Sequence, residues 1–140
     1  MGTISKNFSY KEFERSETAE RLHINNVINT FLVRDNVKAL VDNVLQPLRD
    51  AWGAPLHINS GYRCLKLNQA VGGVPTSQHM LGQAADVRCS EPLKLAKLVK
   101  KLDLEFDQMI LYPTFLHLSY QDGRNRGQIL YNKSWKGGKV

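Results

Sequence analysis

The sequence has 140 residues, of which 42% are hydrophobic and 23% charged, and its formal net charge is +6. This length and composition predict a single soluble domain, residues 1–140, that buries its own core without a disulfide framework. No apolar run approaches the ~20 residues of a membrane span and the N-terminal residues lack a secretory signal, so we expect a protein that stays in the cytoplasm until another agent releases it.

The first predicted elements are two short helices. Ser9 and Glu12 have the spacing of a capping box, in which each side chain bonds the backbone amide of the other residue. This pattern predicts a helix over residues 10–15. A second short turn is expected over residues 16–22.

The strongest helix signal covers residues 30–52. Apolar side chains recur there at spacings of three and four and so share one face: Val33, Val37, Leu40, Val41, Val44, Leu45 and Leu48. Pro47 is expected to kink this helix because proline has no amide hydrogen to donate. Gly53 is expected to end it.

The periodicity then changes to that of strands. Strands are expected over residues 56–60, 84–88, 106–112, 115–120 and 128–132, with helices over residues 64–71 and from a Ser90 cap to residue 102. Pro113-Thr114 separates two apolar runs, which predicts an antiparallel hairpin. The whole pattern indicates an α+β domain, a small antiparallel sheet with helices on one face.

The net positive charge is concentrated at the C-terminal end. Residues 124–140 contain five basic side chains and no acidic one. This segment is either a solvated tail or a patch attracted to an anionic polymer such as cell wall or nucleic acid. Basic residues of a nucleic-acid binder are more often interleaved with aromatic ones, so no nucleic-acid partner is expected. Binding through this tail would show steep salt dependence.

The cysteines and two of the histidines are interpreted as structural. Cys64 and Cys89 are too few for a disulfide framework and too far apart for a paired-cysteine metal site. We expect buried free thiols, although the two could be neighbours in the fold. His23 follows a helical pattern and His57 alternates within a strand, so neither is taken as a ligand.

The chemically informative stretch is SQHMLGQAAD, residues 77–86. His79 precedes a predicted strand and Asp86 lies inside it, and Gly82 between them lets the backbone turn back tightly. His117 is a polar residue within another apolar strand, where it needs a partner. Hydrogen bonds could satisfy each histidine, but two imidazoles and a carboxylate also suit zinc with one position open for water. Such a site supports metal-assisted hydrolysis.

The order of these motifs resembles that of the zinc D-alanyl-D-alanine carboxypeptidases. The matching segments are SxHxxGxAxD with the later His117, SGYR at residues 60–63, Asn68 with VGG, FDQ at residues 106–108, and NRGQ at residues 125–128. The resemblance implies that His79, Asp86 and His117 hold one zinc ion. It also implies a Hedgehog/DD-peptidase fold. The segment of residues 8–26 resembles a branch common in phages and prophages.

The resemblance also implies roles for two further residues. Arg63 would bind the carboxylate of the substrate, a task that suits a planar bidentate donor. Ser77 would place its hydroxyl near the substrate, although a role in capping the local turn is an equal alternative. Thr114 departs from the family, whose active members carry Asp or Glu three residues before the last histidine as general base.

The general base is therefore open, and Asp107 and Glu105 are the nearest acidic candidates. A two-residue hairpin loop would put Ile110 opposite His117 and turn Asp107 away from the zinc. A three-residue loop would bring Asp107 to the zinc side. Asp107 could otherwise fix the hairpin or contact a zinc-ligating histidine.

These features predict a monomeric zinc peptidase that acts on peptidoglycan stem peptides in the cell wall, either as a carboxypeptidase or as an endopeptidase. The alternative is a zinc-containing domain that binds the cell wall or a phage structure without cutting. Thr114 supports that alternative.

Overall fold

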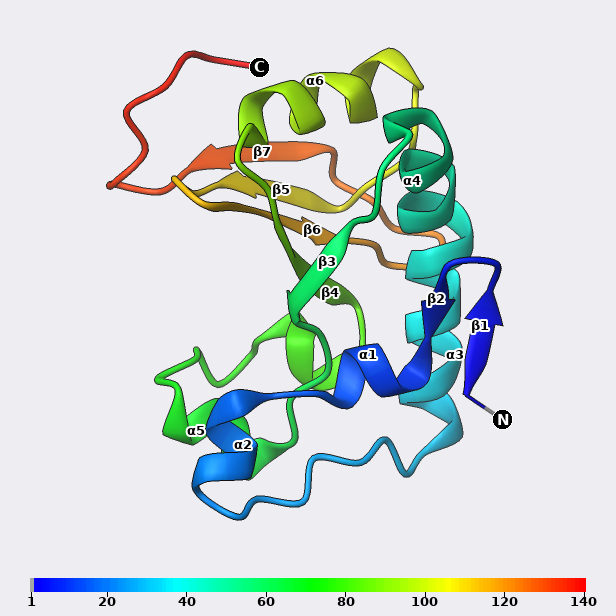
Figure 1. Cartoon of the computed structure of the whole chain (residues 1–140), viewed down its shortest axis with the longest axis vertical. Helices are drawn as coiled ribbons and strands as arrows, with labels where there is room; N and C mark the ends of the chain where they lie inside the picture. The colour runs from blue at the N-terminus through cyan, green and yellow to red at the C-terminus, as the bar shows by residue number, and fades with distance from the viewer. Residues whose placement is uncertain (1) are drawn as a thin grey trace.

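The computed structural model describes residues 2–140, and its centre is a five-stranded sheet (Figure 1). The strand order is β3-β4-β6-β5-β7. The bounds are β3 His57–Ser60, β4 Ala84–Arg88, β5 Gln108–Leu111, β6 Phe115–Ser119 and β7 Gln128–Tyr131. All neighbouring strands are antiparallel except β5 and β7, which are parallel. The predicted α+β class is confirmed, and the parallel edge strand is a departure from the antiparallel sheet that we expected.

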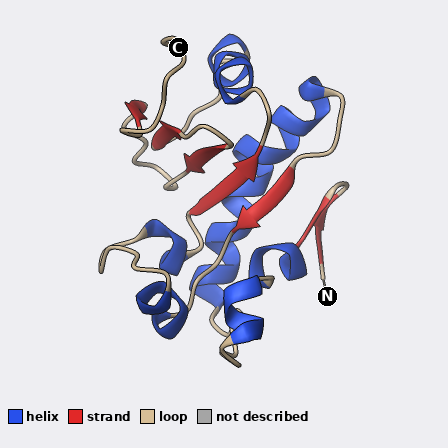
Figure 2. Cartoon of the chain, turned by 60° about the vertical axis from the view of Figure 1, so that its left-hand side comes forward, coloured by secondary structure: helices blue, strands red, loops and turns tan. Residues whose placement is uncertain are grey.

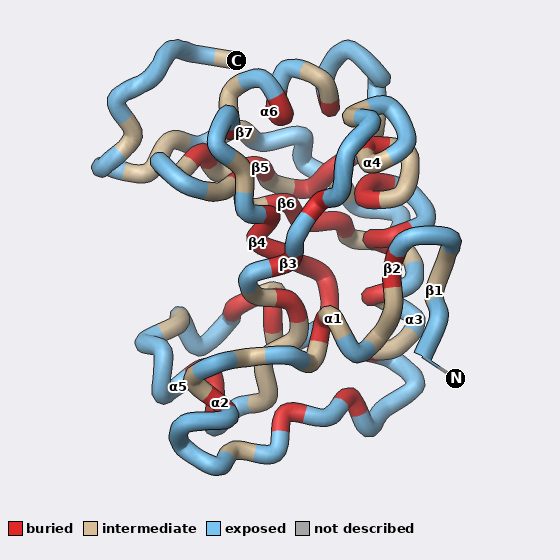
Figure 3. The backbone as a smooth tube through the Cα atoms, viewed as in Figure 1, coloured by how far each residue is buried: buried red, intermediate tan, exposed pale blue. Residues whose placement is uncertain are grey.

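The two faces of the sheet differ in character because side chains alternate along each strand. One face carries the apolar residues Ala85, Val87, Met109, Leu111, Leu116 and Leu118, all fully buried in the hydrophobic core. Figure 3 shows this buried material concentrated where the strands meet the helices. The other face carries Asp86, His117 and Ile110, which lie side by side across β4, β6 and β5. The polar side chains of Asp86 and His117 therefore lie on the face of the sheet away from the core.

A long helical rod supports the core face and passes behind the strands in Figure 2. It consists of α3 (Phe31–Leu40), a π-helical segment η1 (Val41–Leu45) and α4 (Gln46–Trp52). The kink predicted at Pro47 takes the form of this wider turn, in which the amide of Gln46 donates to the carbonyl of Val41. Proline has no amide hydrogen to donate, and the wider π turn tolerates this missing donor. Gly53 ends the rod in the left-handed conformation.

The N-terminal segment packs in front of this rod. It comprises β1 (Thr3–Ser5), β2 (Phe8–Ser9), α1 (Tyr10–Glu14) and α2 (Glu17–Arg21). The capping box predicted from Ser9 and Glu12 is present, with both reciprocal bonds formed. The β1–β2 pair was not predicted, since strands this short leave no periodicity to read.

The remaining helices flank the sheet. They are α5 (Leu65–Ala70), the 3₁₀ turn η2 (Gln78–Leu81) and α6 (Pro92–Lys101). The N-cap of α6 is Glu91 and not the expected Ser90, because Pro92 occupies the first helical position. Within residues 2–140 no helix is both long and apolar enough to cross a membrane.

The C-terminal segment folds back onto the domain. The amide of Val140 donates to the hydroxyl of Tyr131 at 2.9 Å, and the ammonium of Lys139 lies 4.3 Å from the centre of the same ring. Trp135 donates through its indole nitrogen to the carbonyl of Gly138 at 3.0 Å. A solvated tail was one of the two expectations for this segment. These contacts instead hold its end against Tyr131.

Candidate metal centre

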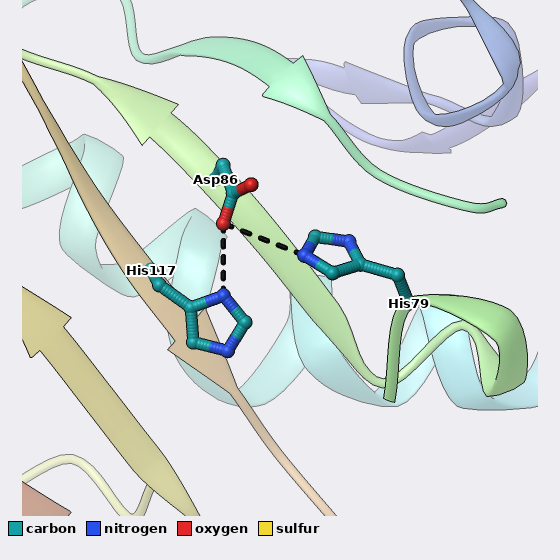
Figure 4. Close-up of side chains that lie close together, drawn as sticks. All are labelled: His79, Asp86 and His117. Atoms are coloured by element: carbon teal, nitrogen blue, oxygen red, sulfur yellow. Dashed lines mark hydrogen bonds and ion pairs between the residues drawn. The ribbon is translucent and has the colours of Figure 1, made fainter. Parts of the chain in front are cut away.

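Three side chains from separate elements converge on the polar face of the sheet (Figure 4). His79 comes from η2, Asp86 from β4 and His117 from β6. Asp86 and His117 are direct cross-strand partners, which brings their side chains together without any loop rearrangement. One ligand atom from each residue can be chosen so that all three lie within 4.8 Å of one another. The cluster predicted from the sequence is therefore assembled in the fold.

Asp86 is the centre of this cluster. Its Oδ1 lies 2.8 Å from Nδ1 of His117 and 3.4 Å from Nε2 of His79. Burial by itself would raise the pKa of Asp86, but the hydrogen bonds with His117 and His79 outweigh it and hold that pKa well below its usual range. The carboxylate is thus ionised at neutral pH, the form in which it can bind a cation.

The ring of His79 is held in one orientation. Its Nδ1 lies 2.7 Å from the carbonyl oxygen of Gly61, and since a carbonyl only accepts, this nitrogen carries the proton and donates. Nε2 faces the cluster, where a bound metal ion would take the place of a proton on this nitrogen. The backbone before and after the ring is fixed as well, because Ser77 accepts the His79 amide at 3.2 Å and Gly82 adopts φ +74°. A Cβ at Gly82 would lie 2.7 Å from the carbonyl oxygen of Val33, so only glycine fits.

The donor set fits a zinc ion. Two imidazole nitrogens and one ionised carboxylate oxygen are the ligands of many catalytic zinc sites, which keep a fourth position open. His79 and Asp86 are buried, and His117 is half-buried. A cavity of about 410 Å³ opens beside these three side chains.

Arg63 forms one wall of this cavity and is tied to its surroundings. Its Nε donates to Ser60 Oγ at 3.2 Å, its Nη1 donates to Asn68 Oδ1 at 3.1 Å, and its Nη2 lies 3.8 Å from Asp86 Oδ2. Gly73 packs against this pair so closely that an added Cβ would overlap Asn68 Oδ1. The guanidinium is therefore fixed beside the metal ligands with N–H groups to spare.

Ser77 also lines the cavity. Its oxygen accepts the His79 amide, so the hydroxyl caps the turn and keeps its own proton available for a substrate. The two roles considered for Ser77 are compatible in this geometry.

Asp107 has other partners. Ile110 pairs with His117, the register that a two-residue loop gives, and Asp107 does not line the metal cavity. Its carboxylate accepts from the backbone amide and the guanidinium of Arg126 at 2.9–3.0 Å and from Gln78 at 3.0 Å. The bond from Arg126 holds the pKa of Asp107 below its usual value. This arrangement joins the C-terminal loop to the residue preceding His79 and leaves the carboxylate poorly placed to take a proton.

Glu105, the other acidic candidate, and Thr114, where the sequence departs from the family pattern, also lie outside the cavity. Glu105 is 3.5 Å from the side-chain nitrogen of Asn125 and lines a separate surface hollow. Thr114 is exposed at the hairpin tip, and its carbonyl accepts the amide of Cys89. Among the described residues that line the metal cavity, Asp86 is the sole carboxylate.

Other residues that line the cavity were given no role from the sequence, among them Gln78, Tyr112 and Arg126. Tyr112 stacks on Phe115, with ring centroids 4.1 Å apart. Burial, followed by the charge of Asp86, raises the pKa of Tyr112, so its hydroxyl is a donor at neutral pH. Tyr112 lies two residues after Ile110 and so shares its face. The alternation of side chains along a strand could have indicated this position from the sequence.

The two cysteines do not form a site. Both are free, as expected, but they are half-buried and not buried. The Cys89 sulfur accepts the amide of Glu91 at 3.3 Å, in keeping with the interpretation as structural thiols.

Comparison with known proteins agrees with the motifs. A curated relative, the zinc D-Ala-D-Ala carboxypeptidase of Streptomyces albus G, is 46% identical over 44 residues. That stretch covers 31% of this chain and 17% of the relative, so the match spans less than a fifth of that protein. The model of the family described as Peptidase M15 matches residues 6–119, a range that contains His79, Asp86 and His117. The chain therefore belongs to the peptidase M15 family.

Proposed function

We propose that this protein is a zinc peptidase that hydrolyses bonds next to D-amino acids in the stem peptides of peptidoglycan. The observation that carries this is the His79, Asp86 and His117 cluster, open to a cavity that Arg63 flanks. Family membership and the relative's zinc carboxypeptidase name support it. We extend the proposal to one zinc ion per chain, a Hedgehog/DD-peptidase type of fold, and a phage-associated or otherwise released monomer whose place of action is the cell wall.

Each group of the cavity has a task in this reaction. Bound zinc would polarise the scissile carbonyl and make a water molecule acidic. His79, Asp86 and His117 would hold the ion, with the tautomer of His79 set by Gly61. Ser77 can donate to a substrate carbonyl, and Arg63 can orient a substrate carboxylate. Tyr112 can donate to the carbonyl oxygen as negative charge develops there.

The proposal is tested with purified peptidoglycan and the zinc-loaded protein. Mass spectrometry of the muropeptides is expected to show either the loss of terminal D-alanine or the conversion of cross-linked dimers to monomers. A chelator should stop the reaction, and added zinc should restore it. Intact muropeptides after prolonged incubation, identical to those from the chelated sample, would contradict a hydrolytic function.

A second candidate function is wall binding without cleavage. The observation that favours it is the lack of a second carboxylate among the described residues of the cavity, because a water molecule that attacks a carbonyl needs a proton acceptor. If the parent does not cut, Tyr112→Glu should introduce chelator-sensitive cleavage, since position 112 faces the cavity. Thr114→Glu is the matched control. At the exposed hairpin tip it should have no such effect.

Asp107→Asn separates a base from a positioning residue. We expect zinc content to be normal and kcat/KM to fall less than about tenfold, with an unchanged pH profile, because the carboxylate is occupied by Arg126 and Gln78. A general base is worth about 10²–10⁴-fold. A loss of that size with zinc retained and an altered acidic limb of the profile would restore Asp107 as the base.

The same variant is expected to reduce stability in a pH-dependent way. Since the folded protein holds the pKa of Asp107 below its unfolded value, the ionised carboxylate stabilises the fold above about pH 4. This contribution is lost as pH falls through the lowered pKa. The free energy of unfolding of the parent should therefore exceed that of Asp107→Asn at pH 7, and the two should converge as the pH falls below about 4. A constant difference across this range would exclude the linkage.

A further inference from the structure

Arg63 does not close the end of the metal cavity. A second cavity, of about 480 Å³, lies against the same arginine and is lined by Ser60, His57, Arg88 and Arg15. Ser60 is the cross-strand partner of Asp86, and its hydroxyl accepts from Arg63. The two cavities therefore adjoin on one face of the sheet, with the guanidinium of Arg63 between them.

The second cavity continues along β4. Arg88 lies two residues after Asp86 on the same strand face, about 7 Å further along. His57 on β3 is the cross-strand partner of Arg88. Arg15, the residue that follows α1, lines the cavity with them. A substrate group that passes Arg63 would thus meet these basic side chains within the length of about two residues.

The positive charge of this second cavity is only partly offset by the protein itself. The side chains of Arg15 and Arg88 have no hydrogen-bond or ion-pair partner among residues 2–140, and both residues are exposed. Glu17 is the sole acidic residue among the described lining residues. Arg63, by contrast, is already bonded to Ser60 and Asn68. Two free guanidinium groups at one hollow are suited to a carboxylate or another anion.

We propose that this second cavity is a subsite for an anionic group on the leaving side of the substrate. It rests on the proposed function, because Arg63 is taken to hold the α-carboxylate of the leaving residue. The side chain of that residue extends past Arg63, and its terminal carboxylate is bound by Arg88 and Arg15. The preferred leaving residue is therefore an acidic D-amino acid, larger than D-alanine.

The test uses acetylated peptides that end in D-alanyl-D-Xaa. Xaa is D-glutamate or its homologue with one more methylene, and each is paired with its side-chain carboxamide. Analogues whose scissile amide is reduced to a methylene-amine report binding to the zinc-loaded protein by calorimetry, without turnover. The variants are Arg88→Gln and Arg15→Gln. Lys97→Gln, an equal change of charge on the exposed face of α6, is the control.

The acidic analogues should bind the parent about fivefold more tightly than their carboxamides, the upper range for an exposed ion pair. Arg88→Gln and Arg15→Gln should remove this preference and leave the affinity for the carboxamides unchanged. Lys97→Gln should leave both affinities unchanged. The proposal is overturned if the parent binds acid and carboxamide equally or binds neither, if the arginine variants weaken both alike, or if Lys97→Gln has the same effect.

Hydrolysis of the unreduced peptides distinguishes a failure of the peptidase function from a failure of the anionic subsite. Preferential binding of the acidic analogues without any cleavage would reject the peptidase function and leave the anionic subsite standing. Cleavage of acid and carboxamide peptides with equal kcat/KM would reject the subsite and leave the peptidase function standing.

Discussion

His79→Ala and His117→Ala are each expected to abolish tight zinc binding and all peptidase activity. Either change leaves two of the three ligands, too few for a stable catalytic zinc site. It also removes one of the two imidazole partners of the buried Asp86 carboxylate, so the unfolding free energy should fall by about 1–3 kcal/mol. Elemental analysis of protein purified without added metal measures the zinc, and chemical denaturation measures the stability.

His23→Ala is the control for these variants, since His23 is exposed in a turn far along the chain from the cluster. It should retain one zinc per chain and full activity. Zinc binding in the parent should also weaken in acid, because protons compete with the metal for the two imidazoles. A parent-like zinc content in His79→Ala or His117→Ala would disprove the ligand assignment.

Arg63→Lys is expected to lower kcat/KM by more than tenfold, or about 1.4 kcal/mol of transition-state stabilisation, while zinc content stays normal. The guanidinium holds Ser60 and Asn68 and still has N–H groups for a substrate carboxylate. A lysine ammonium cannot reproduce this planar fork. Steady-state kinetics on a peptide with a free terminal carboxylate and on its amide measure the effect.

The loss in Arg63→Lys should be larger for the free acid than for the amide. An equal loss on both peptides, together with a lower melting temperature, would assign Arg63 to support of the turn. Gly73→Ala offers an independent probe. The added methyl group would displace Asn68 from Arg63, and the charge of Arg63 would stay the same. Unchanged kinetics in Arg63→Lys would remove this residue from the site.

The elements that carry the metal cluster were predicted because their signals are local to two strands and one turn. Asp86 and His117 lie on strands whose apolar alternation could be read directly, and Gly82 marked the turn that returns His79 toward them. The strand of residues 84–88 was predicted with its correct bounds. Asp86 and His117 are 31 residues apart, so local patterns located the elements, and the resemblance to the zinc carboxypeptidases implied that the three residues form one site.

The features that were missed depend on partners distant in sequence. Asp107 takes its partners from Gln78, 29 residues earlier, and Arg126, 19 residues later, so spacing along the hairpin could not reveal them. The parallel pairing of β7 with β5 is set by a long connection in the same way. The cap of α6 was misjudged because Pro92 occupies the first helical position, and the π form of the turn before Pro47 was not foreseen because proline is compatible with more than one local structure.

The π turn of η1 affects the orientation of α4, the helix that follows it in the rod. Such a turn contains one residue more than an α-helical turn, and one residue corresponds to about 100° of rotation about the helix axis. Val41, Val44, Leu45 and Leu48 are all buried, and Gln46 points to the N-terminal segment, where its side chain bonds Ser5 and Asn7. Deleting Asn43, which is exposed, would remove the extra residue and restore a regular helix, in which α4 keeps its present face toward the core. Homologous helices aligned without a gap at this point would have the wrong faces of α4 superposed.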